Sequence, residues 1–136
     1  MPHLEVIVNG PPISSQSKSK VKLLTWKAVI RSEVAKHWGS RAPLTSKVRC
    51  TILYFHEGDT ASMDDDNMVK PIRAAMNRLV YEDDSQICYS ETIQISIDAS
   101  MKLRRASLAL LAAFSVGNEF VYIRIDDMPE TIQLPE

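Results

Sequence analysis

Apolar residues recur along the chain with two different spacings, one typical of strands and one typical of helices, and segments of the two kinds follow each other in turn. Short apolar or alternating runs are typical of strands, because successive strand side chains point to opposite faces. Such runs occur at 4–8, 47–55, 92–98 and 120–125. The run at 92–98 alternates most clearly and places Ile93, Ile95 and Ile97 on one face.

Apolar residues three or four positions apart predict helices in the intervals between these strands. The first stripe consists of Leu23, Trp26, Ile30, Val34 and Trp38, and Gly39 follows at the position of a helix C-cap. A second helix is expected to open at 64–67, to run over 67–78 and to hold Pro71 in or near its first turn. A third is expected over 102–115, although its LALLAAFSV segment would also suit a strand.

Strands and helices therefore alternate, which predicts one α/β domain (mixed α+β) over residues 1–136, in which helices accompany a small mixed sheet. Residues 11–20 form a polar, basic loop, and residues 127–136 form a C-terminal tail.

The composition, 45% hydrophobic and 24% charged over 136 residues, is that of an ordinary globular domain. No apolar run is long enough to cross a bilayer, and the N-terminus lacks the pattern of a secretory signal, so we expect a cytoplasmic protein without membrane contact. Cys50 and Cys88 have no metal-ligand spacing and are expected to be reduced core thiols.

The net charge of −1 hides a strong asymmetry between the two parts of the chain. Residues 1–50 carry nine Lys/Arg against two Asp/Glu, whereas residues 51–136 carry seven against fifteen. A basic part beside an acidic part suits a protein that holds phosphate with one surface and metal ions with another. The candidate phosphate contacts are Lys18, Lys20, Lys22, Lys27 and Arg31, for which a simple solvated helix face is the open alternative.

Two acidic clusters are the main candidates for chemistry. Aspartate occupies 64–66, the first acidic cluster, and Glu-Asp-Asp occupies 82–84, the second. Crowded carboxylates raise one another's pKa unless solvent or a cation compensates their charge. If both clusters face one cleft, their oxygens suit Mg²⁺, with Mn²⁺ as the other option. The alternative is that the first cluster only caps a helix and the second only forms a turn.

Residues 63–87 read M-D-D-D-N-M-V-K-P-I-R-A-A-M-N-R-L-V-Y-E-D-D-S-Q-I. This string resembles the RusA family of Holliday-junction resolvases, whose hallmark is D-x-D-N-x-x-K-(P), a helix, and then an aromatic residue leading into (E)-D-D-S-Q-(I/V). The early V-x-G-x-P pattern of that family is echoed in Val8, Gly10 and Pro12.

The resemblance implies roles for five residues. Asp64, Asp66 and Asp84 would ligate the metal, Asp83 would support the site, and Lys70 would contact the scissile phosphate or stabilise charge in the transition state. It also implies an α/β homodimer that nicks opposed strands of a four-way junction in a Mg²⁺-dependent reaction of DNA recombination and repair.

The sequence departs from the family pattern at two positions of this string. Ala74 stands where the family usually has an aspartate, and Arg78 stands where it usually has a turn glycine. Two other classes of function therefore stay open. One is a junction-binding protein that has lost cleavage, and the other is a structural or regulatory dimer.

The spacing of the two clusters poses a geometric problem. A helix over 67–78 would be about 18 Å long, and residues 79–83 can return at most about 17 Å. The two clusters can share a site in one chain only if the helix is shorter and the chain returns tightly, which is the arrangement we expect. The alternative is a site completed across a dimer.

Overall fold

The structure is a computed structural model that describes residues 1–58, 63–97 and 106–136. Its strands are β1 (Leu4–Asn9), β2 (Val48–His56), β3 (Ile87–Ser96) and β4 (Phe120–Asp127). Its helices are α1 (Lys20–Trp38), α2 (Asp65–Ala75) and α3 (Leu108–Val116), with a short 3-10 turn, η1, at Asp84–Gln86.

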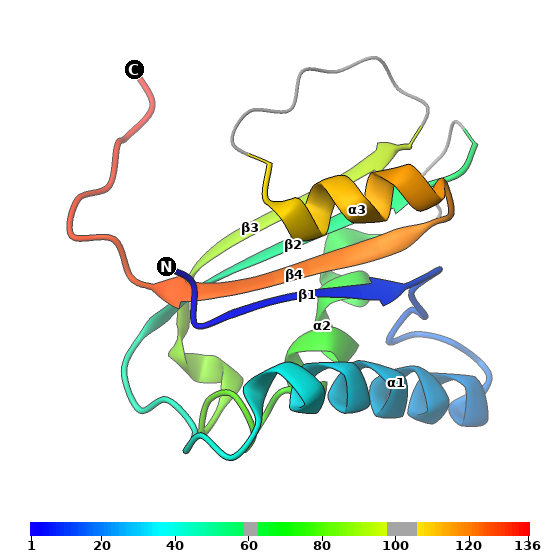
Figure 1. The fold of residues 1–136 in the computed structure, drawn as a ribbon. Coiled ribbons are helices and arrows are strands. Elements are labelled where there is room, and N and C mark those ends of the chain that lie inside the picture. Colours follow the sequence, from blue (N-terminus) through cyan, green and yellow to red (C-terminus); the bar gives the residue numbers. More distant parts are fainter. Residues whose placement is uncertain (59–62, 98–105) are drawn as a thin grey trace.

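The strands form one mixed sheet in the order β1-β4-β2-β3. β4 runs antiparallel to both of its neighbours, with Leu4 opposite Ile125, whereas β2 and β3 are parallel. The parallel pair requires a crossover, and α2 supplies it between β2 and β3. α1 and α2 cover one face of the sheet and α3 lies on the other (Figure 1). The predicted mixed α/β architecture is thereby confirmed.

The main core lies between the sheet and the two helices α1 and α2. The predicted stripe is confirmed at four of its five residues, since Trp26, Ile30, Val34 and Trp38 are buried, whereas Leu23 is half-buried. They meet buried side chains of β2 and α2 such as Ile52. Full burial of one such side chain stabilises a fold by about 1.5–3 kcal/mol, so this face holds α1 and α2 in place.

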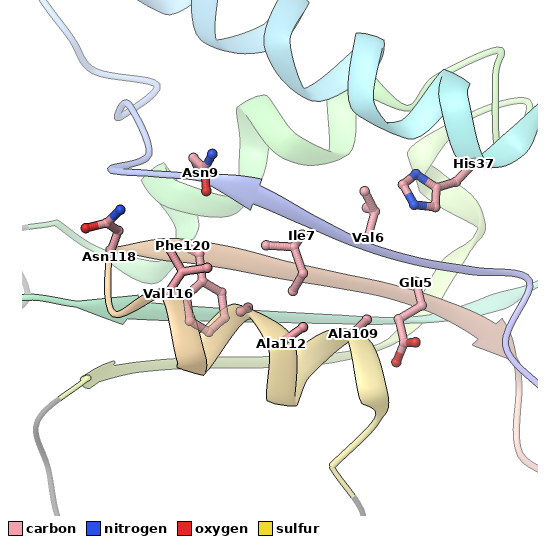
Figure 2. A pocket seen from close by; sticks show the side chains of 11 residues that line it. Glu5, Val6, Ile7, Asn9, His37, Ala109, Ala112, Val116, Asn118 and Phe120 are labelled. Atoms are coloured by element: carbon pink, nitrogen blue, oxygen red, sulfur yellow. The ribbon is translucent and has the colours of Figure 1, made fainter.

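A smaller core joins α3 to the opposite face of the sheet. Phe55 stacks on Phe120 with ring centroids 4.9 Å apart, and Phe114 of α3 meets Phe55 edge-on at 4.7 Å. A pocket of about 340 Å³ separates α3 from β1, with Ile7 and Phe120 turned toward the helix (Figure 2). Neither acidic cluster contributes to the lining of this pocket.

Several predicted boundaries were wrong. α2 begins at Asp65, within the predicted start at 64–67, but it ends at Ala75 and not at 78, and Pro71 is its seventh residue and therefore lies beyond the first turn. β3 begins at Ile87 and not at 92, because the strand follows the 3-10 turn η1 without an intervening loop. The expected third helix is confirmed for the LALLAAFSV segment, which forms α3 and not a strand. The predicted end of the third strand at residue 98 and start of the third helix at 102–105 lie outside the described residues.

No helix in the described part of the chain has the length and apolar character needed to cross a membrane.

The two cysteines differ, which corrects the expectation of two core thiols. Cys50 is buried in β2, whereas Cys88 in β3 is exposed. Burial raises the pKa of the Cys50 thiol from its ordinary 9.0 to about 11. Between pH 9 and 11 the thiol of Cys50 therefore stays protonated in the folded protein but loses its proton in the unfolded chain. The resulting stability is complete below pH 9 and is lost as the pH rises toward 11.

We therefore expect a thiol reagent at pH 8 to label Cys88 rapidly in the folded protein and Cys50 only after denaturation, because the thiolate is the reactive form. Counting modified thiols per chain with and without denaturant measures this. A Cys88→Ser variant is the control, and rapid labelling of that folded variant would contradict the buried placement of Cys50.

Arg78 follows α2 and has a φ of 62°, and it is the single non-glycine residue with positive φ among those described. Its N–H donates to the carbonyl of Tyr81 at 2.7 Å and closes the turn. The left-handed conformation costs a non-glycine residue about 1–2 kcal/mol. Position 78, where the family that the sequence resembles usually has glycine, is thus a position whose backbone conformation favours glycine.

Arg78→Gly should raise the free energy of unfolding by about 0.5–1 kcal/mol, since the extra freedom of glycine in the unfolded chain offsets part of the relieved strain. Thermal denaturation should show an increase in Tm of roughly 2–4 °C. Lys47→Gly, at an exposed position without positive φ, is the matched control and should not stabilise. An unchanged or lower Tm for Arg78→Gly would refute the interpretation.

Candidate functional site

The first acidic cluster begins α2. Asp64 is the N-cap residue, yet its side chain makes no capping hydrogen bond. Asp65 accepts a hydrogen bond from the Gln94 side chain of β3 at 2.6 Å. All three aspartates are exposed, and none forms an ion pair with the cations of the described residues. The carboxylates of Asp64 and Asp66 therefore keep their charge available to a ligand.

A contact at the second turn of α2 fixes the basic loop beside this cluster. Pro71 has no N–H, so the carbonyl of Asn67, four residues earlier, lacks its helical donor. The backbone N–H of Ser15 donates to this carbonyl at 2.9 Å. The Ser15 hydroxyl also donates to Oδ1 of Asn67 at 3.1 Å. The loop before α1 is thus bound to α2 immediately after the aspartates.

Three of the predicted phosphate contacts lie on or directly after this loop. Lys18 follows Ser15 by three residues, so at most about 10 Å of backbone separates it from the contact with α2. Lys20 and Lys22 belong to the first turn of α1, and all three lysines are exposed. The fold therefore brings these lysines into the neighbourhood of the first acidic cluster.

The other two predicted phosphate contacts lie farther along α1. The Arg31 guanidinium donates to the carbonyls of Ala75 and Asn77 at 3.0 and 2.9 Å. It thereby satisfies carbonyl groups at the C-terminal end of α2, which is a structural role. Lys27 is half-buried.

Lys70 is exposed and lies one turn after Asp66. Side chains four residues apart share a helix face, so Lys70 and Asp66 point to the same side of α2. No ion pair joins them. The ammonium group is thus placed beside the carboxylates without neutralising them.

The second acidic cluster is held by hydrogen bonds of its own. Asp83 caps η1, where its carboxylate accepts from the Ser85 N–H at 2.9 Å and Gln86 accepts from the Asp83 N–H at 3.0 Å. Hydrogen bonds from the side chain and backbone of Ser85 lower the pKa of Asp83 below its usual range. Asp84 follows in the first position of η1 and is half-buried.

Two further contacts fix where this second cluster lies. The Gln86 amide donates to the carbonyls of Leu44 and Ser46, at 2.9 and 2.8 Å, just before β2. The buried Tyr81 hydroxyl donates to the carbonyl of Arg73 at 2.7 Å, in the last turn of α2. The second cluster is consequently anchored near the C-terminal end of α2 and the start of β2.

The two clusters therefore lie at opposite ends of α2, whose 11 residues span about 16 Å. Among the residues that the structure describes, no three His, Cys, Asp or Glu side chains are grouped so that they could hold a metal ion. α2 does end at Ala75, three residues before the predicted end, and the chain turns tightly at Arg78, but these features do not bring the two clusters together in one chain. The set of Asp64, Asp66 and Asp84 stays a prediction that one chain alone does not assemble.

The donors nevertheless fit a divalent cation in their chemistry. Mg²⁺ prefers oxygen ligands and is often held by one or two carboxylates, with water and substrate phosphate completing its shell. Asp64 and Asp66 offer two exposed carboxylates without an ion-pair partner in the described chain. They could hold such an ion incompletely, and a third carboxylate would improve the site.

Sequence reasoning missed the residues that position the site. Ser15, Asn67 and Gln94 organise the surroundings of the first cluster, and Tyr81 and Gln86 anchor the second. The proline four residues after Asn67 was a usable signal, since it leaves one helical carbonyl without a donor. No local pattern identifies Ser15 as the donor, because that pairing depends on the tertiary fold.

The contact between Ser15 and Asn67 yields a prediction for stability. Ser15→Ala and Asn67→Ala should each lower the free energy of unfolding by about 1 kcal/mol, because each removes one partly buried hydrogen bond. The double variant should cost clearly less than the sum, with a coupling of about 0.5–1 kcal/mol. Urea denaturation of the four proteins measures the cycle. Ser14→Ala replaces Ser15→Ala in the control cycle, and equal coupling there would refute the contact.

Comparison with known families gives a match over most of the chain. The profile of the family described as endodeoxyribonuclease RusA matches residues 11–100. The match includes the basic loop, α1, α2, both acidic clusters and β3. No curated protein matches the chain.

Proposed function

The chain belongs to the RusA family of endodeoxyribonucleases, whose profile matches more than half of it, and we propose that it is a Mg²⁺-dependent endonuclease that nicks branched DNA at four-way junctions. Its role would lie in DNA recombination and repair, and its active form would be a homodimer in the cytoplasm. A two-fold symmetric enzyme offers one site to each of two opposed strands of such a junction.

The observation that carries this proposal is the juxtaposition of uncompensated carboxylates with a basic loop. Asp64 and Asp66 have no cationic partner among the described side chains, and the contact between Ser15 and Asn67 holds exposed lysines nearby. Lysines that contact phosphates position DNA without reading its sequence. This suits an enzyme that recognises the shape of a junction.

Each residue would have a distinct task at the scissile phosphate. Asp64 and Asp66, with Asp84, would hold the divalent cation. When bound, the cation would activate water and stabilise charge on the phosphate. Lys70, on the same side of α2 as Asp66, would contact a non-bridging phosphate oxygen. Asp83 would keep η1 in shape through its capping box.

The capping alternative receives little support at the first cluster. If the aspartates served only to start α2, the N-cap side chain would accept a backbone N–H, which Asp64 does not do. The second cluster differs, since Asp83 does cap η1. Its neighbour Asp84 is therefore the residue of that cluster proposed for the cation.

We expect wild-type protein to nick a labelled immobile four-way junction with Mg²⁺ and not with EDTA. Asp66→Asn should lower the rate by roughly a hundredfold or more, because losing one cation ligand removes several kcal/mol of stabilisation. Asp65→Asn is the matched control and should retain most activity, since Asp65 is occupied by Gln94. Nicking products are resolved on a denaturing gel.

Junction binding by gel shift is measured on the same samples. Intact binding without nicking in Mg²⁺ or Mn²⁺ would favour a junction-binding protein that has lost cleavage. Equal activity of Asp65→Asn and Asp66→Asn would remove Asp66 from the site.

A further inference from the structure

A groove lies between the first half of α1 and the segment that follows β1, and we call it the α1 groove. Its volume is about 330 Å³. Val21 and Val29, on one of its sides, are 74% and 42% exposed. Sites for small planar groups are typically concave and mostly apolar, with a few polar groups that fix orientation. The residues of the α1 groove that matter here are Pro11, Ile13, Val21, Lys22, Trp26 and Val29.

Trp26 is the buried member of the α1 groove, and one of its atoms lacks a partner. The side chain is 5% exposed, and its Nε1 is buried without a hydrogen-bond acceptor in the described chain. The other tryptophan differs, since the Trp38 N–H donates to the carbonyl of Arg41 at 2.9 Å. Buried N–H groups without an acceptor are uncommon in native proteins and cost free energy. A ligand that carries an acceptor would satisfy the Trp26 N–H.

The surroundings of the α1 groove are positively charged. Between Glu5 and Glu33 the chain carries five Lys/Arg and no acidic residue. Lys22 lines the groove itself, and Lys18 and Lys20 are exposed just before it in the chain. Such a surface attracts phosphates. An apolar groove with a buried donor and a basic rim therefore suits a nucleobase that is attached to its sugar-phosphate strand.

We propose that the α1 groove receives one unpaired nucleobase of the branched DNA. The inference rests on the proposed function, since branched DNA is the substrate of that function. The apolar side chains would contact the base, the Trp26 N–H would donate to a carbonyl oxygen or ring nitrogen of the base, and Lys22 would contact the adjoining phosphate. Side-chain movements commonly accompany binding, and one is needed here to bring the buried N–H within reach of the base.

The α1 groove lies close to the first acidic cluster along the chain. Ile13, which lines the groove, precedes Ser15 by two residues, and the Ser15 N–H donates to the Asn67 carbonyl of α2. At most about 7 Å of backbone therefore separates the groove wall from this contact. Because successive phosphates of one strand are about 3.4 Å apart along a duplex, a base in the groove would lie a few nucleotides from a phosphate at the aspartates.

Branched DNA is the substrate that supplies such a base most readily. Moving a base out of a continuous duplex costs free energy, and this cost is least where the base is already unpaired. Stacking is interrupted at a branch point, so an unpaired base is more accessible there. The α1 groove would thus favour a branch point over a continuous duplex.

The pocket between α3 and β1 is of similar size and is the competing site (Figure 2). Its lining contains Glu5 and neither lysine nor arginine. A phosphate-bearing strand would be repelled there. The charge of the lining therefore favours the α1 groove for a nucleobase.

Equilibrium binding in EDTA tests the α1 groove without cleavage. The probe is a fluorescently labelled four-way junction with one unpaired thymine at the branch point. The matched probe carries an abasic residue in place of that thymine and has the same number of phosphates. Wild type should bind the thymine junction about tenfold more tightly, because contacts to one base typically change affinity by a factor of this order. The readout is the ratio of the two dissociation constants, in which the contacts to phosphates cancel.

Two pairs of variants locate the preference. Val29→Glu should bring the ratio close to one, because a longer, charged side chain occupies the groove. Leu24→Glu places the same charge on an exposed apolar residue of α1 outside the groove lining and should keep the ratio near ten. Trp26→Phe retains an aromatic ring without the N–H and should lower the ratio to about three, whereas Trp38→Phe should leave it unchanged.

A wild-type ratio near one would overturn the proposal, and so would an equal loss of the preference in Val29→Glu and Leu24→Glu. Nicking in Mg²⁺ separates this result from the proposed function. A junction that is nicked while the ratio stays near one would refute the base site alone. A tenfold ratio without nicking in Mg²⁺ or Mn²⁺ would support the base site and refute the proposed cleavage.

Discussion

The arrangement of the proposed site depends on one carbonyl group. Pro71 deprives the Asn67 carbonyl of its helical hydrogen bond, and the backbone N–H of Ser15 takes the vacant position. Most helical carbonyls are already paired and cannot bind a distant loop. A proline in the second turn of α2 thus creates an acceptor at the place where the lysine-bearing loop must join the aspartates. The proline costs helix stability, and the contact compensates part of that loss.

The second cluster is fixed by different means, and the contrast explains why the clusters stay apart. Gln86 binds carbonyls before β2, and Tyr81 binds a carbonyl at the end of α2. These bonds hold Asp84 at the start of β3. The hydrogen bond between Gln94 and Asp65 holds the first cluster near the end of β3. Because β2 and β3 are parallel, the connecting helix must run the length of the sheet before β3 can begin. The separation is therefore a property of the topology, and local rearrangement would not remove it.

The sequence predicts the elements well and their assembly less well. The period of Trp26, Ile30, Val34 and Trp38 identified α1 and its buried face, because burial on one side of a helix leaves a regular pattern. β3 was placed too late, since the first residues of the strand, ICYSE, do not alternate in hydrophobicity, although their burial alternates between half-buried and exposed. The role of Arg31 was not foreseen, because its partners, the carbonyls of Ala75 and Asn77, are brought to it only by the packing of α1 on α2. The motif identified Asp64, Asp66 and Asp84 together but contains no information on whether they belong to one chain.

The parallel pair of strands explains why the two acidic clusters are separate. A βαβ unit places the start of its helix at one end of the sheet and the start of its second strand at the other, so residues at those two starts cannot meet in one chain. In this chain the two acidic clusters stand at those two starts.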